Sequence, residues 1–139
     1  MLITRREVKV EWGECDPADI VFYPNYFIWF DASVMEHFES VGLPKKELLK
    51  RYNLNGWPMI DTRARFHKPS SYGDIVTIET CIPKWGRTSF EIEHKLFNKG
   101  ELAVEGFEKR VLVGRDPETG KLKSVPVPAE VIELFGTSE

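Results

Sequence analysis

The chain has 139 residues, of which 42% are hydrophobic and 29% charged, a balance typical of a globular protein with its own core. Its net charge of −3 provides no basic excess, which argues against a nucleic-acid-binding protein. No apolar run is long enough to cross a bilayer, and no apolar segment of a signal peptide follows the N-terminus. Cys15 and Cys81 form neither a disulfide framework nor a metal-binding spacing. We therefore expect one cytoplasmic domain, residues 1–139, without metal, membrane or nucleic-acid partner.

The first half of the chain predicts one strand and two helices. Residues 3–12 alternate between polar and apolar side chains, as a strand does. A long aromatic helix is predicted over residues 24–41, where Pro24 suits the first helical position and Asn25 suits a capping side chain. A short helix is expected over residues 45–52. Because the long helix is apolar around its whole circumference, it should be wrapped by other structure.

The second half predicts an antiparallel sheet. Period-two alternation indicates strands over residues 58–67 and 90–96, and β-branched residues indicate a strand over 75–82. A long final strand is expected over 102–113, with a short return strand near 122–125. Turns over residues 83–87, 98–100 and 116–120 join them, so the strands run antiparallel. A bulge is expected at Gly106, a closing helix over 129–134, and frayed residues over 136–139. One apolar helix against one curved antiparallel sheet is an α+β fold.

Asp16 lies in an acidic turn directly before the long helix. Most aspartates in turns bond to their own backbone, and an Asx-turn or a helix cap is the ordinary interpretation. The functional alternative is a carboxylate near the positive end of the helix dipole that acts on a substrate carbonyl. Glu14 and Asp19 are neighbouring acids that compete for this role.

Asp31 is a charge inside the apolar helix, and charged residues are almost never fully buried without a partner. It either reaches a subunit interface or pairs with an arginine, or it serves as a hydrogen-bond acceptor at the bottom of an apolar pocket. Both alternatives stay open on the sequence alone.

The three histidines, His37, His67 and His94, show no metal-ligand spacing and no nucleophile motif, so we expect structural roles, with His94 a hydrogen-bonded core residue. The turn over residues 85–89 is either a solvated β-turn or a clamp for phosphate built on Arg87 and backbone N–H groups. A basic strip of Arg63, Arg65 and Lys68 is expected to be solvated or interfacial.

Five sequence landmarks now come together: CDPADIVFYPNY, WFDA, GWPMI, YGDIVTIETCI and WGRTSF. In their order and spacing the chain resembles the 4-hydroxybenzoyl-CoA thioesterase family of hot-dog-fold proteins, in its Pseudomonas-type branch. The resemblance implies a long central helix wrapped by a curved antiparallel sheet. It also implies hydrolysis of an acyl-CoA thioester without metal or redox cofactor, and a homo-oligomer, dimer or tetramer, with active sites at the subunit interface.

The resemblance assigns roles to ten residues. Asp16 would be the catalytic carboxylate, as nucleophile or general base, and the backbone N–H of Tyr23 would polarise the thioester oxygen. Asp31 would accept a hydrogen bond from the hydroxyl of a 4-hydroxybenzoyl group. The remaining family positions would contact the substrate or grip the CoA phosphates: Lys46, Trp57, Pro58 and Met59 for the former, and Gly86, Arg87 and Thr88 for the latter.

Two departures and three rivals accompany this hypothesis. The family motif has glycine where this chain has Asp19, and the turn around Arg87 is less basic than the family's. A short-chain aliphatic acyl-CoA thioesterase of the Tol–Pal-associated type would share Asp16. A non-catalytic acyl-CoA-binding protein would result if Asp19 disrupted the turn. A hot-dog dehydratase is disfavoured because no histidine lies in the acidic turn.

Overall fold

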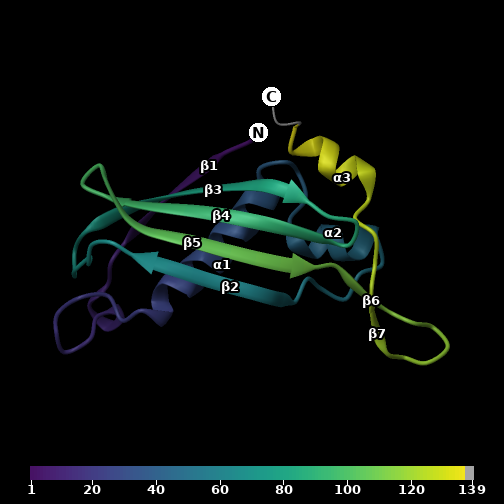
Figure 1. The fold of residues 1–139 in the computed structure, drawn as a ribbon, viewed down its shortest axis with the longest axis horizontal. Helices are drawn as coiled ribbons and strands as arrows, with labels where there is room; N and C mark the ends of the chain where they lie inside the picture. Colours follow the sequence, from purple (N-terminus) through teal and green to yellow (C-terminus); the bar gives the residue numbers. More distant parts are fainter. Residues whose placement is uncertain (137–139) are drawn as a thin grey trace.

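A long helix lies diagonally across one face of a twisted antiparallel sheet in the computed structural model, which describes residues 1–136 (Figure 1). The sheet order is β1-β3-β4-β5-β2, and every neighbouring pair is antiparallel. Its strands are β1 (Thr4–Lys9), β2 (Met59–Phe66), β3 (Ile75–Trp85), β4 (Ser89–Asn98) and β5 (Glu101–Val111). The predicted α+β arrangement is confirmed.

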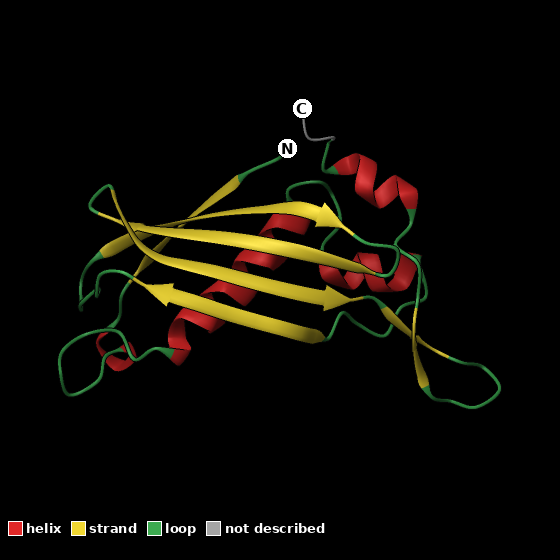
Figure 2. Ribbon diagram, viewed as in Figure 1, coloured by secondary structure: helices red, strands yellow, loops and turns green. Residues whose placement is uncertain are grey.

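The remaining elements flank this sheet (Figure 2). They are the 3₁₀ turn η1 (Trp12–Glu14), the helices α1 (Pro24–Glu39), α2 (Lys45–Arg51) and α3 (Ala129–Leu134), and the ribbon of β6 (Val113–Arg115) with β7 (Leu122–Ser124). Each predicted helix and strand is present, with ends shifted by a few residues. The fraying expected over residues 136–139 falls mostly on residues 137–139, which lie outside the described residues.

The turn predicted over residues 83–87 begins later than expected. β3 continues to Trp85, and its register against β4 shifts between Cys81 and Lys84. This irregularity takes in Pro83, whose missing N–H cannot serve a regular ladder and is tolerated at a bulge. The connection between β3 and β4 is therefore confined to residues 86–88.

The bulge predicted at Gly106 is wrong. Gly106 is in regular register with Ala64 on β2 and His94 on β4. The irregularity of the β4–β5 pair falls between Leu96 and Phe97 instead. A Cβ atom on Gly106 would lie 2.5 Å from Cε2 of Phe30. Glycine is needed here because the helix approaches the sheet closely, not because the strand bends.

The inner face of α1 supplies much of the core. Phe30, Val34 and Phe38 are at most 2% exposed and pack toward the sheet. The opposite face is open, with Ile28 63% exposed. We expected other structure to surround the whole helix. Within the single chain, the sheet covers only one side of it. No helix within residues 1–136 is both long and apolar enough to span a membrane.

Replacement of Gly106 by alanine tests this close approach. We expect Gly106→Ala to lower the free energy of unfolding by about 1–3 kcal/mol, because the added methyl group overpacks against the Phe30 ring. Urea denaturation measures the effect. Gly13→Ala is the control, since nothing lies within 4 Å of its added Cβ. A stability gain in Gly106→Ala, as strand propensity alone would give, would contradict the packing argument.

Candidate active site

The acidic turn folds around the Asp16 carboxylate. Oδ1 of Asp16 accepts the backbone N–H groups of Ala18 at 2.9 Å and Ile20 at 3.4 Å. The N–H of Asp16 donates to the Ile20 carbonyl at 2.8 Å. The Asx-turn interpretation is thus correct as geometry. Both side-chain bonds fall on Oδ1, so the turn fixes the carboxylate while Oδ2 accepts no hydrogen bond from the described residues.

The neighbouring acids do not share this situation. Glu14 accepts the indole N–H of Trp29 on Oε2 at 2.9 Å and the N–H of Glu11 on Oε1 at 2.7 Å. Both of its oxygens are therefore occupied by structural bonds. Asp19 is exposed, and its N–H donates to the Asp16 carbonyl at 2.9 Å. Of the three candidates, Asp16 is the half-buried acid with an unoccupied oxygen.

Asp19 takes the left-handed conformation, with φ of +65°. This explains why glycine suits the position, since an L side chain there costs on the order of 1 kcal/mol. Aspartate tolerates the conformation better than most residues. The turn nevertheless closes, so the predicted departure leaves its hydrogen bonds intact.

The N-terminus of α1 lies beside Asp16, and Tyr23 and Asp16 line the same cavity. Tyr23 is the residue before the helix and Pro24 occupies its first position, as predicted. Among residues 1–136 no backbone or side-chain acceptor takes the Tyr23 N–H. The capping role predicted for Asn25 is wrong: its Nδ2 donates to the Glu14 carbonyl at 2.9 Å, which ties the helix to the acidic turn.

A cavity of about 370 Å³ opens beside these groups. Its lining combines the acidic turn, the start of α1 and the residues that end and follow β2: Asp16, Ile20, Val21, Tyr23, Tyr26, Phe66, His67, Lys68 and Pro69. The basic side chains of this lining already have partners, since His67 contacts Glu105 at 2.9 Å and Lys68 forms an ion pair with Glu101. The cavity therefore presents one carboxylate among mainly apolar and aromatic walls.

The other predicted contact residues gather at the far end of β2. The segment from Trp57 to Met59 leads into this strand, and Trp57 is only 2% exposed. The Nζ of Lys45 lies 5.1 Å from the centre of the Trp57 ring. A second cavity of about 410 Å³ lies here, and three cations, Lys45, Arg110 and Arg115, are part of its lining. The other lining residues are Asn55, Gly56, Trp57, Pro58, Val113 and Leu122.

The turn between β3 and β4 lies at this same end of the sheet (Figure 1). Gly86 donates its N–H to the Ser89 carbonyl at 2.7 Å, and the carbonyl of Thr88 accepts from Leu112 at 2.9 Å. Arg87 is exposed, and so is Lys46 on α2. Among the described residues, no hydrogen bond or ion pair engages either cation. The predicted phosphate contacts and the neighbouring Lys45 thus belong to one basic end, although the sequence did not single out Lys45.

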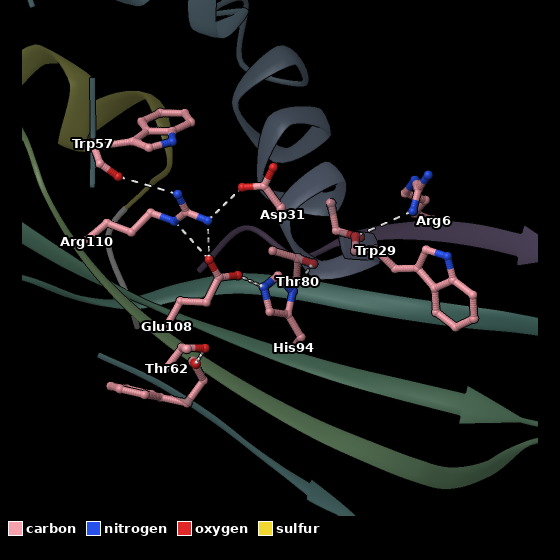
Figure 3. Close-up of polar contacts among 11 residues, drawn as sticks. Arg6, Trp29, Asp31, Trp57, Thr62, Thr80, His94, Glu108 and Arg110 are labelled. Carbon is pink, nitrogen blue, oxygen red and sulfur yellow. Dashed lines mark hydrogen bonds and ion pairs between the residues drawn. The ribbon is translucent and has the colours of Figure 1, made fainter. Parts of the chain in front are cut away.

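Asp31 is not at the bottom of an apolar pocket within this chain. Its side chain is 53% exposed, and Oδ1 accepts Nη2 of Arg110 at 2.8 Å (Figure 3). The interpretation of an acid paired with an arginine is therefore correct. Arg110 is bound in turn by Glu108, at 2.6 Å from Nη2 to Oε1. Neither Glu108 nor Arg110 was predicted from the sequence as a site residue.

Two histidines are structural, as predicted. His94 is 1% exposed and hydrogen-bonded on both ring nitrogens, to Thr80 at 2.8 Å and to Glu108. His37 is also 1% exposed, its Nδ1 is bonded to the Thr4 hydroxyl at 2.7 Å, and burial lowers its pKa to about 4. No group of three or more His, Cys, Asp and Glu side chains within residues 1–136 is arranged to hold a metal ion.

The Asp16 cavity and the basic end lie at opposite ends of β2. A strand rises about 3.3 Å per residue, so the eight residues of β2 separate the two groups by roughly 23 Å. β2 is also one of the two edge strands of the sheet, and seven of its eight residues are exposed, all except Ala64. One chain therefore does not bring all the predicted site residues together.

Comparison with known proteins identifies the class of protein that this fold and site define. The Thioesterase-like superfamily matches residues 10–135. The 4-hydroxybenzoyl-CoA thioesterase of Pseudomonas sp. strain CBS-3 is 37% identical over 132 residues, which cover 91% of this chain and 92% of that protein. Its solved structure superposes with a TM-score of 0.86 at 36% identity, covering 95% of this chain and 98% of that one.

A second relative supports the same grouping. The structure of the gentisyl-coenzyme A thioesterase BH1999 is 30% identical, with a TM-score of 0.81, and covers 96% of this chain and 100% of that one. The chain belongs to the thioesterase-like superfamily and has the hot-dog fold. The predicted family resemblance, fold class and enzyme class, a thioester hydrolase, are confirmed.

Replacement of Asp19 tests the strain in the acidic turn. We expect Asp19→Gly to raise the free energy of unfolding by up to about 1 kcal/mol, because glycine adopts the left-handed conformation without steric cost. Thermal or urea unfolding measures the change. Asn53→Gly, at a second non-glycine residue with φ of +53°, is the matched control and should gain similarly. A loss of stability in Asp19→Gly alone would show that the Asp19 side chain holds the turn.

Proposed function

We propose that this protein is an acyl-CoA thioesterase that hydrolyses a small aromatic acyl-CoA of the 4-hydroxybenzoyl type. One observation carries the proposal: a turn-fixed carboxylate, that of Asp16, and the Tyr23 N–H, which has no acceptor among residues 1–136, line one mainly apolar cavity. In this proposal residues 1–139 act as one cytoplasmic domain, a setting that suits the free thiols of Cys15 and Cys81.

The proposed chemistry needs a base or nucleophile and a donor for the developing oxyanion. Asp16 either attacks the thioester carbonyl or takes a proton from a water that attacks it. The Tyr23 N–H stabilises the charge on the carbonyl oxygen, aided by the positive end of α1. By either route one water is consumed, the carbon–sulfur bond breaks, and the free acid and CoA leave.

We propose that a second copy of the chain completes the site, in a dimer or in a tetramer of such dimers. Exposed sheet edges carry unpaired backbone groups and are normally protected, and β2 exposes Met59, Ile60 and Phe66 along such an edge. Antiparallel pairing of β2 with its copy across a two-fold axis sets the end of one strand beside the start of the other. The Asp16 cavity of one subunit then lies next to the basic end of its partner.

This arrangement assigns the rest of the substrate to the basic end. Lys46 and Arg87 would bind the CoA phosphates at the turn that Gly86 and Thr88 form on either side of Arg87, and these exposed cations have no competing ion pair among the described residues. Trp57, Pro58 and Met59 would contact the acyl and pantetheine portions. Asp31 would accept a hydrogen bond from the hydroxyl of the acyl ring through Oδ2.

The relatives support the acyl class that we propose. The Pseudomonas protein is named for 4-hydroxybenzoyl-CoA and BH1999 for gentisyl-coenzyme A, both hydroxylated aromatic acyl groups. The short-chain aliphatic alternative fits less well, because an aliphatic acyl group offers no hydrogen bond to the Asp31 carboxylate. The non-catalytic alternative depended on a disrupted acidic turn, whereas the turn retains its hydrogen bonds despite Asp19.

The proposal predicts the effect of replacing Asp16. Asp16→Asn should lower kcat by roughly 10²- to 10⁴-fold, because the amide keeps the turn hydrogen bonds but has no basic oxygen. Thiol release from 4-hydroxybenzoyl-CoA measures the rate. Asp19→Asn is the control: it removes a carboxylate from the same turn and tolerates the left-handed conformation, so it should keep its activity. Near wild-type turnover by Asp16→Asn would sink the assignment.

A further inference from the structure

A continuous chain of polar side chains runs through the core and ends at Asp31 (Figure 3). Thr80 on β3 bonds to Nδ1 of His94 on β4 at 2.8 Å, and Nε2 of His94 bonds to Oε2 of Glu108 on β5. Oε1 of Glu108 accepts Nε and Nη2 of Arg110, at 2.8 and 2.6 Å. The members from Thr80 to Arg110 are at most 6% exposed, whereas Asp31 opens to solvent.

Arg110 joins two parts of the proposed acyl site. Its Nη2 donates to Oδ1 of Asp31 at 2.8 Å, and its Nη1 donates to the carbonyl oxygen of Trp57 at 3.4 Å. A guanidinium is planar and its donors have fixed directions, so one group sets the relative positions of both acceptors. Because Oδ1 of Asp31 is occupied, Oδ2 is the oxygen left to meet a ligand.

The rest of the chain holds Arg110 in place. Burial raises the pKa of Glu108, but the hydrogen bonds from His94 and Arg110 and the charge of Arg110 outweigh it and hold that pKa below its usual value. Phe30 stacks on His94 with ring centres 4.5 Å apart and planes 3° apart, which restricts the imidazole. A buried, fully bonded network of this kind favours a single geometry.

We propose that Arg110 is a positioning residue that determines which acyl group the enzyme prefers. It orients the Asp31 carboxylate and the Trp57 carbonyl together, so that Oδ2 of Asp31 accepts a hydrogen bond from a neutral hydroxyl on the acyl ring. The same carboxylate disfavours an acyl group that carries its own negative charge. This inference rests on the proposed function and adds the residues that set its substrate class.

The alternative is a purely structural role, in which the charged side chains of Asp31, Glu108 and Arg110 only hold α1 against the sheet. In that case their removal would lower stability and slow all substrates alike. A positioning role predicts a selective effect instead, because only a hydroxylated ring uses the oriented oxygen. The ratio of kcat/KM for 4-hydroxybenzoyl-CoA to that for benzoyl-CoA therefore separates the two interpretations.

The test uses a variant that leaves no buried charge unpaired. Arg110→Met alone would strand the Glu108 carboxylate and threaten folding, so we choose the double variant Arg110→Met/Glu108→Gln. Its selectivity ratio should fall roughly 10- to 100-fold, as the loss of a well-oriented hydrogen bond to a charged acceptor implies. The fall should come from a lower kcat/KM for 4-hydroxybenzoyl-CoA, whereas kcat/KM for benzoyl-CoA should stay unchanged. The matched control is Arg5→Met/Glu79→Gln, which neutralises an ion pair of 2.9 Å at the surface and should keep the wild-type ratio.

Asp31→Ala provides the second arm. If it lowers the ratio and the Arg110/Glu108 substitutions add no further loss in that background, the residues act through one contact, as proposed. Suppose instead that Asp31→Ala lowers the ratio, whereas the double variant keeps the wild-type ratio or lowers kcat/KM for both substrates equally. The positioning role of Arg110 is then wrong, and the proposed function stands. If the wild-type enzyme hydrolyses neither ester, or Asp31→Ala keeps the ratio, the proposed acyl class fails and the inference fails with it.

Discussion

The close approach of α1 to the sheet is the constraint on which the rest of the structure depends. Phe30 reaches the floor of the sheet only because Gly106 has no side chain, and from there it stacks on His94. That contact fixes the helix along its length. The N-terminus of α1 is consequently held beside the acidic turn, to which Asn25 and Trp29 are hydrogen-bonded. The middle of the helix delivers Asp31 to Arg110.

The helix thereby links the proposed chemistry to the proposed selectivity. Asp16 and the Tyr23 N–H lie at one end of β2, where an oxyanion would be stabilised. Arg110 connects Asp31 to Trp57 toward the start of β2, where the cations gather. Because β2 is an exposed edge that spans the distance between the two ends, a second copy paired along it would unite them. Fold, site and assembly are in this view consequences of one short edge strand and one tightly packed helix.

Much of this was predictable from local pattern. Period-two alternation and β-branched residues predicted the strands of the sheet, and Pro24 marked the start of α1, because these signals reside in neighbouring residues. The landmarks around Asp16 indicated the family. Features that depend on contacts between distant segments were missed or misjudged. Gly106 looked like a bulge because the ring of Phe30 that requires it is far away in sequence.

Glu108 and Arg110 show the same limit. In the segment GFEKRVL the charged residues Glu108 and Arg110 resemble those of a solvent-exposed strand. They nevertheless lie on one face of the strand, and Glu105, Phe107 and Lys109 lie on the opposite face. Their i, i+2 spacing with Val104 and Gly106 was the available signal, since alternate residues share a face. What no local pattern supplies is the partner of a buried charge. That information lies in His94 and Asp31, which fold onto β5 from another strand and a helix.

The most direct measurement is complementation between two inactive variants. Asp16→Asn removes the carboxylate at one end of β2, and Arg87→Glu reverses a proposed phosphate contact at the other. When equal amounts are unfolded together and refolded, half of the dimers are hybrids, and each contains one intact site if the two residues of a site come from different subunits. We expect recovery to about a quarter of wild-type thiol release at limiting 4-hydroxybenzoyl-CoA, as random pairing of two-fold dimers requires. Activity no greater than the sum of the separate variants would contradict a site shared across β2.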